Sequence, residues 1–106
     1  MTLPPLTEAH FMDQVTDLAA LFGWDWAHFR PAQTLRGWRT PVSGPLGKGF
    51  PDLVLVRGSR LLFAELKRDG AKLTFDQARI HALLLPAADC YVWRPQDWDF
   101  IETVLR

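Results

Sequence analysis

Two acidic residues and one lysine near the middle of the chain are the strongest candidates for chemistry. Asp52 begins one apolar run, and Glu65 and Lys67 end the next one. Lys67 follows Glu65 by two residues, so in a strand both side chains project from the same face. Two acids and a lysine on one patch suit an oxygen-ligated divalent cation, with the lysine left to orient water or to offset charge on a phosphate. The structural alternative is a salt bridge between Lys67 and Glu65, with Asp52 merely starting a strand.

The two apolar runs, residues 53–57 and 61–67, are predicted to form a β-hairpin. The two residues between them begin with Gly58, which favours a type II′ turn. A two-residue turn fixes the register and places Asp52 opposite Glu65, about 5 Å apart at Cβ. Like charges so close repel unless they share a proton or hold a cation, and the structural alternative does not explain why both are there.

The elements around this hairpin predict a small mixed α/β fold. Both faces of the hairpin are apolar, so we expect it at the centre of a sheet with helices on both faces. The pattern predicts helices over about residues 7–22, 74–85 and 96–105, and strands over 24–29 and 89–93. A short strand is possible over 38–42 in a long loop rich in Pro and Gly. Because a helix precedes it, the strand over 89–93 is expected to run parallel to an earlier strand.

The size and composition of the chain predict one domain over residues 1–106. A chain of 106 residues can close one hydrophobic core but not two. No apolar run is long enough to cross a bilayer and the N-terminus lacks the plan of a signal peptide, so a cytoplasmic protein is expected. The single cysteine, Cys90, excludes disulfides within the chain and cysteine-rich zinc sites, and it is expected to be a small core residue.

The charges are spread very unevenly although they sum to zero. Residues 1–27 hold four acids and no Lys or Arg (−4), residues 28–79 hold ten bases and four acids (+6), and residues 80–106 hold two bases and four acids (−2). The middle segment is therefore the part that could face phosphate. Its ten bases are Arg30, Arg36, Arg39, Lys48, Arg57, Arg60, Lys67, Arg68, Lys72 and Arg79.

Within that segment, a loop combines cations with an aromatic residue. Arg36, Trp38 and Arg39 suit phosphate contact plus stacking on an unpaired base. The alternative is that the tryptophan packs on the core and that single charges are simply solvated. The residues expected to contact DNA are Arg30, Arg36, Trp38, Arg39, Lys48, Arg68 and Lys72.

Two further polar residues are candidates for the same site. Glu8 continues the apolar stripe of the first helix and could reach the acids, but it equally suits an exposed first-turn acid favoured by the helix dipole. Gln77 either faces the site or closes a capping box with Thr74, and both roles could coexist. His28 and His81 are interpreted as structural or groove-lining residues, since oxygen ligands suit the expected metal.

The motif residues resemble a known nuclease signature. Gly49-Phe50-Pro51-Asp52, twelve intervening residues and then Glu65-Leu66-Lys67 resemble the PD-(D/E)XK pattern. Three features together resemble the small stand-alone VRR-NUC domains of phage and bacterial genomes: Gly-Phe-Pro-Asp-Leu before the hairpin, Glu-Leu-Lys-Arg after it, and Gln77 ten residues past the lysine. The resemblance covers essentially the whole chain.

The resemblance implies a fold, a reaction and a set of roles. The fold would be a restriction-endonuclease-like αβββαβ core. The activity would be a Mg²⁺- or Mn²⁺-dependent phosphodiesterase acting on DNA, often branched, and small members resemble homodimeric Holliday-junction resolvases. Glu8, Asp52 and Glu65 would be acidic metal-site residues, the Leu66 carbonyl a further ligand, Lys67 the catalytic lysine, and Gln77 the motif glutamine on the helix facing the site.

The leading hypothesis is therefore metal-dependent hydrolysis of DNA phosphodiesters, with structure-selective cutting and no membrane association. A narrower rival is a homodimeric resolvase specific for four-way junctions. A rival of another class is a module that binds DNA or protein without cutting, although such a module has no need of opposed acids.

Overall fold

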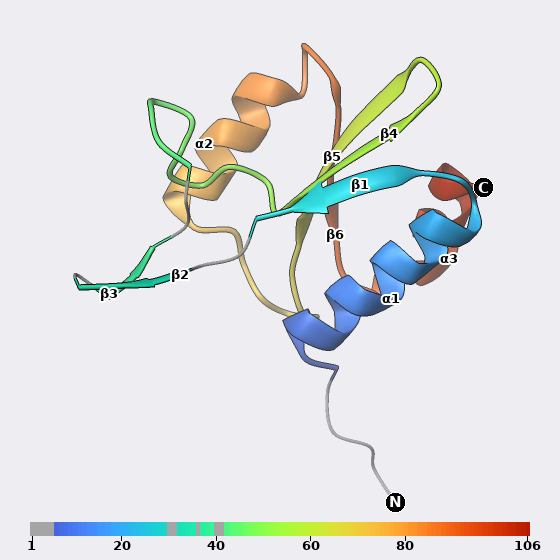
Figure 1. Cartoon of the computed structure of the whole chain (residues 1–106), viewed down its shortest axis with the longest axis horizontal. Coiled ribbons are helices and arrows are strands. Elements are labelled where there is room, and N and C mark those ends of the chain that lie inside the picture. The colour runs from blue at the N-terminus through green and yellow to red at the C-terminus, as the bar shows by residue number, and fades with distance from the viewer. Residues whose placement is uncertain (1–5, 30–31, 36, 40–41) are drawn as a thin grey trace, which may run out of the picture.

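The protein is a mixed α/β structure built on a four-stranded sheet with the strand order β1-β4-β5-β6 (Figure 1). This computed structural model describes residues 6–29, 32–35, 37–39 and 42–106. The sheet strands are β1 (Asp25–His28), β4 (Leu53–Arg57), β5 (Arg60–Leu66) and β6 (Asp89–Trp93). The helices of the described part are α1 (Glu8–Leu21), α2 (Phe75–Leu84), the short 3-10 helix η1 (Pro95–Asp97) and α3 (Trp98–Leu105).

The predicted hairpin is confirmed in register, with β4 as predicted and β5 one residue earlier at each end than the predicted 61–67. β4 and β5 pair antiparallel from Leu53 opposite Ala64 to Arg57 opposite Arg60. Gly58 in the turn has φ 61°, a positive value that glycine adopts at no steric cost. β4 and β5 are the two central strands, as the two apolar faces of the hairpin predict.

The strand after α2 runs parallel to β5, as expected for a strand that follows a helical crossover. Glu65 lies beside Val92 and Leu66 beside Trp93 in this parallel pair. On the other edge, β1 pairs antiparallel with β4 and is one residue shorter at each end than predicted. The sheet is therefore mixed, as predicted.

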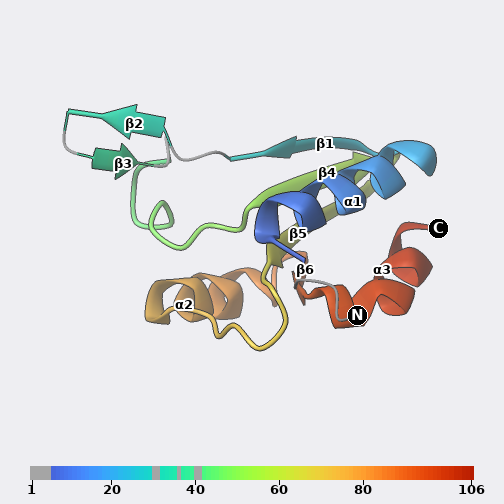
Figure 2. The ribbon, with the colours of Figure 1, turned by 90° about the horizontal axis from the view of Figure 1, so that it is seen from below.

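Helices cover both faces of the sheet. The buried side chains of α1 and α3 pack in one core with the face of the sheet that carries Leu53, Leu55 and Leu62. α2 lies on the opposite face, where its Ile80 is fully buried. The two views agree that α2 and α3 lie on opposite sides of β6 (Figures 1 and 2).

The helix boundaries follow from local capping. Thr7 caps α1 by accepting a hydrogen bond from the His10 amide, and Gly23 follows the last turn with φ 82°. Thr74 caps α2 with a complete capping box. The last predicted helix is divided, since Pro95 begins a 3-10 turn and α3 starts only at Trp98.

A small second sheet lies in the long loop where one short strand was predicted. β2 (Ala32–Thr34) and β3 (Gly37–Arg39) pair antiparallel with each other and not with the main sheet. The prediction of a strand over 38–42 was therefore shifted by one residue at its start, and its partner strand was missed. The pair extends beyond β1, on the side of the molecule away from α3 (Figure 2).

Two arginines at the hairpin tip, Arg57 and Arg60, bind the ends of two helices, a contact that the charge pattern of the sequence did not predict. Arg57 donates to the carbonyls of Phe22 and Leu105 over 3.1 and 2.9 Å, and Arg60 donates to a third helix-end carbonyl. Both guanidinium groups also lie over the Trp24 ring, at 4.5 and 5.2 Å from its centroid. Cations at helix C-termini satisfy the last carbonyls, so these two charges stabilise the fold.

Among the described residues, no helix combines the length and apolar character needed to cross a membrane.

Candidate functional site

Asp52 is held at the point where β4 begins. Its Oδ2 accepts a hydrogen bond of 2.9 Å from the Leu66 amide, and its own carbonyl accepts one of 3.0 Å from the Phe29 amide. The side chain is half-buried. The pairing of β4 and β5 ends at Leu53 opposite Ala64. One residue further on, the Asp52 carboxylate accepts the hydrogen bond from β5 in place of a main-chain carbonyl.

Glu65 lies next to it on β5 and is almost completely buried. Only 5 % of the residue is exposed. Its Oε1 accepts a hydrogen bond of 2.9 Å from Gln77 Nε2, whereas Oε2 is buried with no hydrogen-bond partner among the described residues. A buried oxygen without a partner is costly, and this one can be satisfied either by a proton shared with the neighbouring Asp52 carboxylate or by a bound cation.

The electrostatics of Glu65 favour a proton when no cation is present. The pKa of Glu65 is raised from 4.5 to about 9, mainly by burial and then by the nearby Asp52 carboxylate, while the Lys67 ammonium opposes the shift. The predicted proximity of the two acids is therefore present, and it has the cost expected of opposed carboxylates. A divalent cation between them would reverse the balance, because it favours the charged form of both groups.

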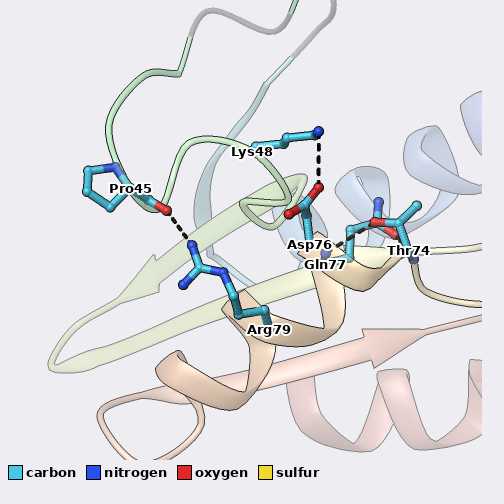
Figure 3. Close-up of polar contacts among 6 residues, drawn as sticks. All are labelled: Pro45, Lys48, Thr74, Asp76, Gln77 and Arg79. Atoms are coloured by element: carbon cyan, nitrogen blue, oxygen red, sulfur yellow. Dashed lines mark hydrogen bonds and ion pairs between the residues drawn. The ribbon is translucent and has the colours of Figure 1, made fainter.

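Gln77 performs both of the roles that were left open. Its amide nitrogen end donates to Glu65 Oε1, while its Oε1 accepts a hydrogen bond of 2.9 Å from the Thr74 amide. The Gln77 main-chain amide donates to Thr74 Oγ1 in return, which completes the capping box. The first turn of α2, where Figure 3 shows Gln77 against Thr74, therefore fixes the side chain that donates to Glu65.

The loop that leads to Asp52 is docked on the same turn of α2. A Cβ on Gly49 would lie 2.5 Å from the Asp76 carbonyl carbon, and Gly49 has φ 90°. Lys48 pairs with Asp76 over 3.4 Å, and Arg79 donates to the Pro45 carbonyl over 2.7 Å (Figure 3). The same contacts between this loop and α2 thus position both Asp52 and the helix that orients Glu65.

Two cavities share Glu8, and Asp52 lines one of them, whereas the buried Glu65 lines neither. One, of about 480 Å³, brings Asp52 and Leu66 together with Glu8, and the other, of about 600 Å³, brings Lys67 and Arg68 together with Glu8. Glu8 therefore lies between the acid side and the basic side of the site. The first cavity is also lined by Ala9, Met12, Asp13, His28 and Phe29.

The main chain of Leu66 faces the first cavity. The Leu66 side chain belongs to the hydrophobic core and the residue is only 2 % exposed, which leaves its main chain to line the cavity. Its N–H is directed at Asp52, and the N–H and C=O of one strand residue point to the same side. The carbonyl predicted as a ligand is therefore on the side of Asp52.

The side chains alone do not form a complete metal-binding cluster. Within the described ranges, no group of three or more His, Cys, Asp or Glu side chains is placed to hold a metal ion. The structure brings Asp52 and Glu65 together, and Glu8 shares the cavity of Asp52 without joining the acidic pair. The donor set that fits a divalent cation consists of two carboxylates and a carbonyl oxygen, the type that Mg²⁺ and Mn²⁺ prefer.

The structure describes the side chains of only some of the residues expected to contact DNA. Arg30 and Arg36 lie outside the described residues, and of Trp38 and Arg39 only the strand backbone is described. The side chain of Lys48 is 88 % exposed but paired with Asp76. Arg68 and Lys72 are exposed.

Some cavity residues were missed in the sequence. Met12 follows Glu8 by four residues, a helical spacing that could have placed it beside Glu8, whereas the five-residue spacing of Asp13 gave no such signal. His28 lines the cavity, in agreement with its interpretation as groove-lining. Cys90 is a buried core residue as expected, with its Sγ 3.4 Å from His81 Nδ1.

Comparison of the chain with protein-family models, with curated proteins and with solved structures found no match.

Proposed function

We propose that the protein is a divalent-metal-dependent nuclease that hydrolyses DNA phosphodiester bonds at Asp52 and Glu65. The observation that carries the proposal is the buried Glu65 carboxyl, which has one oxygen without a partner and a second carboxylate beside it. A protein with a purely structural use for these residues would gain by replacing one acid with an amide or an apolar residue. A cation explains why both are kept in a buried site.

The order of elements supports a restriction-endonuclease-like core as part of this proposal. Without the small β2–β3 pair, the described chain runs as one helix, three strands, a helix and a strand, followed by α3. The three strands are antiparallel neighbours and the last strand is parallel to β5. That order agrees with the αβββαβ core implied by the PD-(D/E)XK resemblance.

The residues of the site have separate roles in the proposed reaction. The carboxylates of Asp52 and Glu65 and the carbonyl of Leu66 would hold Mg²⁺ or Mn²⁺. When bound, the cation supplies Lewis-acid stabilisation of charge on the phosphate and makes water a stronger nucleophile near neutral pH. Lys67, on the other side of Glu8, offsets the negative charge that develops on the phosphate.

The remaining residues position these groups. The Leu66 amide fixes the Asp52 carboxylate, and Gln77 fixes Glu65 from the first turn of α2. Burial of Glu65 excludes water from one side of the acidic pair, which strengthens its attraction to a cation. Glu8 borders both cavities and could complete the coordination only after a shift of its exposed side chain.

A homodimeric four-way-junction resolvase remains the narrower form of this proposal. Symmetric cutting of a two-fold branched substrate is most simply done by two related sites. This form is supported by the family resemblance rather than by a contact in the molecule. Light scattering of the protein, free and bound to a junction, tests it, and a monomer in both states contradicts it.

The experiment that tests the proposed function is cleavage of a panel of labelled DNAs. Duplex, single strand, flap and four-way junction are each incubated with the protein in Mg²⁺, Mn²⁺ or EDTA. Cleavage of at least one form with a metal and of none in EDTA is expected. DNA binding without cleavage of any form, in either metal, would favour a non-cleaving binding module instead.

A further inference from the structure

Two aromatic side chains on edge strand β1 stack on each other, and one of them, His28, lines the Asp52 cavity. The ring centroids of Trp26 and His28 are 5.6 Å apart and the ring planes are inclined by 26°. The two residues alternate along one strand, so their side chains project from the same face. His28 also lines the cavity that contains Asp52, which makes the pair continuous with the proposed site.

Trp26 is only partly buried. It lies opposite Leu55, whose side chain is fully buried, yet 40 % of Trp26 is exposed. The other tryptophan next to this strand, Trp24, is 3 % exposed and donates its indole N–H to the Leu105 carbonyl over 2.8 Å. A large exposed aromatic surface held rigid by a neighbouring ring is what a stacking partner requires.

The cavities beside this pair define a path for one strand of nucleic acid. The pair leads into the cavity of Asp52 and Leu66, and the adjoining cavity beyond Glu8 carries the cations of Lys67 and Arg68. Aromatic rings recognise bases and cations recognise phosphates, and here the two kinds of group lie on either side of Glu8, with Asp52 on the aromatic side. A base at one side and a backbone phosphate at the other would hold a strand across Asp52.

We propose that Trp26 and His28 form a stacking platform for an unpaired base of the DNA strand that enters the Asp52 cavity. The proposal rests on the proposed nuclease function, and it assigns the substrate class as DNA with an unpaired base beside the cut. Bases of a continuous duplex are stacked on one another and have no free face for the platform. Single strands, flaps and branch points supply such a base.

The test is binding of labelled single-stranded and duplex oligonucleotides in EDTA and low salt, followed by fluorescence anisotropy. Trp26→Leu is expected to weaken single-strand binding by about tenfold, because stacking on an aromatic ring contributes on that order per base. Duplex binding should change by less than about twofold, since no unpaired base is present. Trp26→Phe keeps a ring and should retain most of the affinity.

Phe100→Leu is the matched control, because Phe100 is 54 % exposed but lies on α3, where its ring packs against Tyr91 of β6. It should leave single-strand and duplex binding unchanged. A single strand that carries iodouracil should cross-link under light to the peptide containing Trp26, and this cross-link should be lost in Trp26→Leu.

The outcomes separate this inference from the proposed function. Equal single-strand binding by wild type and Trp26→Leu, or loss of both single-strand and duplex binding, overturns the platform, whether or not the protein cuts DNA. Selective loss of single-strand binding supports the platform even if no metal-dependent cleavage is found. A dimer in wild type that Trp26→Leu converts to a monomer would also overturn it, because the ring would then serve the contact between edge strands of two copies.

Discussion

The substitution Glu65→Gln should stabilise the metal-free protein, and more so as the pH rises. Gln has the shape of protonated Glu and can keep the hydrogen bond with Gln77, but it never becomes charged. Because the pKa of Glu65 is raised from 4.5 to about 9 in the folded protein, the fold binds a proton that the unfolded chain has released. The contribution of this group to stability is therefore complete below pH 4.5 and is lost as the pH rises through about 9.

The size of the effect follows from the same shift. Between pH 4.5 and about 9, each rise of one pH unit lowers the free energy of unfolding by about 1.4 kcal/mol. The roughly 2.5 units from 4.5 to pH 7 therefore correspond to a loss of about 3 kcal/mol. Since Glu65 is only 5 % exposed, solvent screening does not reduce this figure much. Glu65→Gln should lose this pH dependence and be more stable than wild type by up to about 3 kcal/mol at pH 7.

The assay is urea unfolding in EDTA at several values between pH 5 and pH 8.5, followed by tryptophan fluorescence. Glu102→Gln is the matched control, because Glu102 pairs with Arg106 at the surface and should show a difference of only a few tenths of a kcal/mol. If wild type and Glu65→Gln keep the same difference in unfolding free energy at every pH, then Glu65 is ionised in the metal-free fold. The argument for a cation site from its burial would then fail.

Three further substitutions test separate parts of the structure. Asp52→Asn should keep the hydrogen bond from the Leu66 amide, so its free energy of unfolding in EDTA should equal or exceed that of wild type. Asp52→Ala loses this bond and should cost about 1–3 kcal/mol in urea unfolding. A larger loss in Asp52→Asn than in Asp52→Ala contradicts this. Gly49→Ala should lower the melting temperature by the equivalent of about 2 kcal/mol, since its Cβ would meet α2 and its φ is positive; an unchanged melting temperature would mean that the loop does not dock. Arg57→Met should destabilise the fold by about 2 kcal/mol, because it loses two hydrogen bonds to helix-end carbonyls, while the salt dependence of DNA binding stays the same. A flatter salt dependence would mean that Arg57 contacts DNA phosphates.

The hairpin and the helices could be predicted because their signals are local. A two-residue turn beginning with Gly58 determines which residues of β4 and β5 face each other. Thr7 and Thr74 mark helix starts through hydrogen bonds to residues three positions away. The proximity of Asp52 and Glu65 follows from the same register, so the central pair of the candidate site was also predictable.

The remaining features depend on contacts between distant parts of the chain. Arg57 looks like a phosphate-facing cation in the sequence, but its partner Leu105 is 48 positions away. Gly49 reads as one glycine among several, and only the approach of Asp76 shows why a side chain cannot stand there. The β2–β3 pair is short and lies among turn-forming residues, so its pattern is too weak to distinguish from a loop.

The central claim is that the acidic pair and Lys67 form a centre for metal-dependent phosphodiester hydrolysis. Its most direct test is the single-turnover rate of cleavage with Mn²⁺ by wild type, Lys67→Ala and Glu65→Gln, on whichever DNA of the panel wild type cuts, with DNA affinity measured in parallel. Wild type should cut, and each variant should bind the DNA with similar affinity but lose cleavage by at least about a hundredfold. Cleavage by Lys67→Ala and Glu65→Gln at the wild-type rate would contradict the claim.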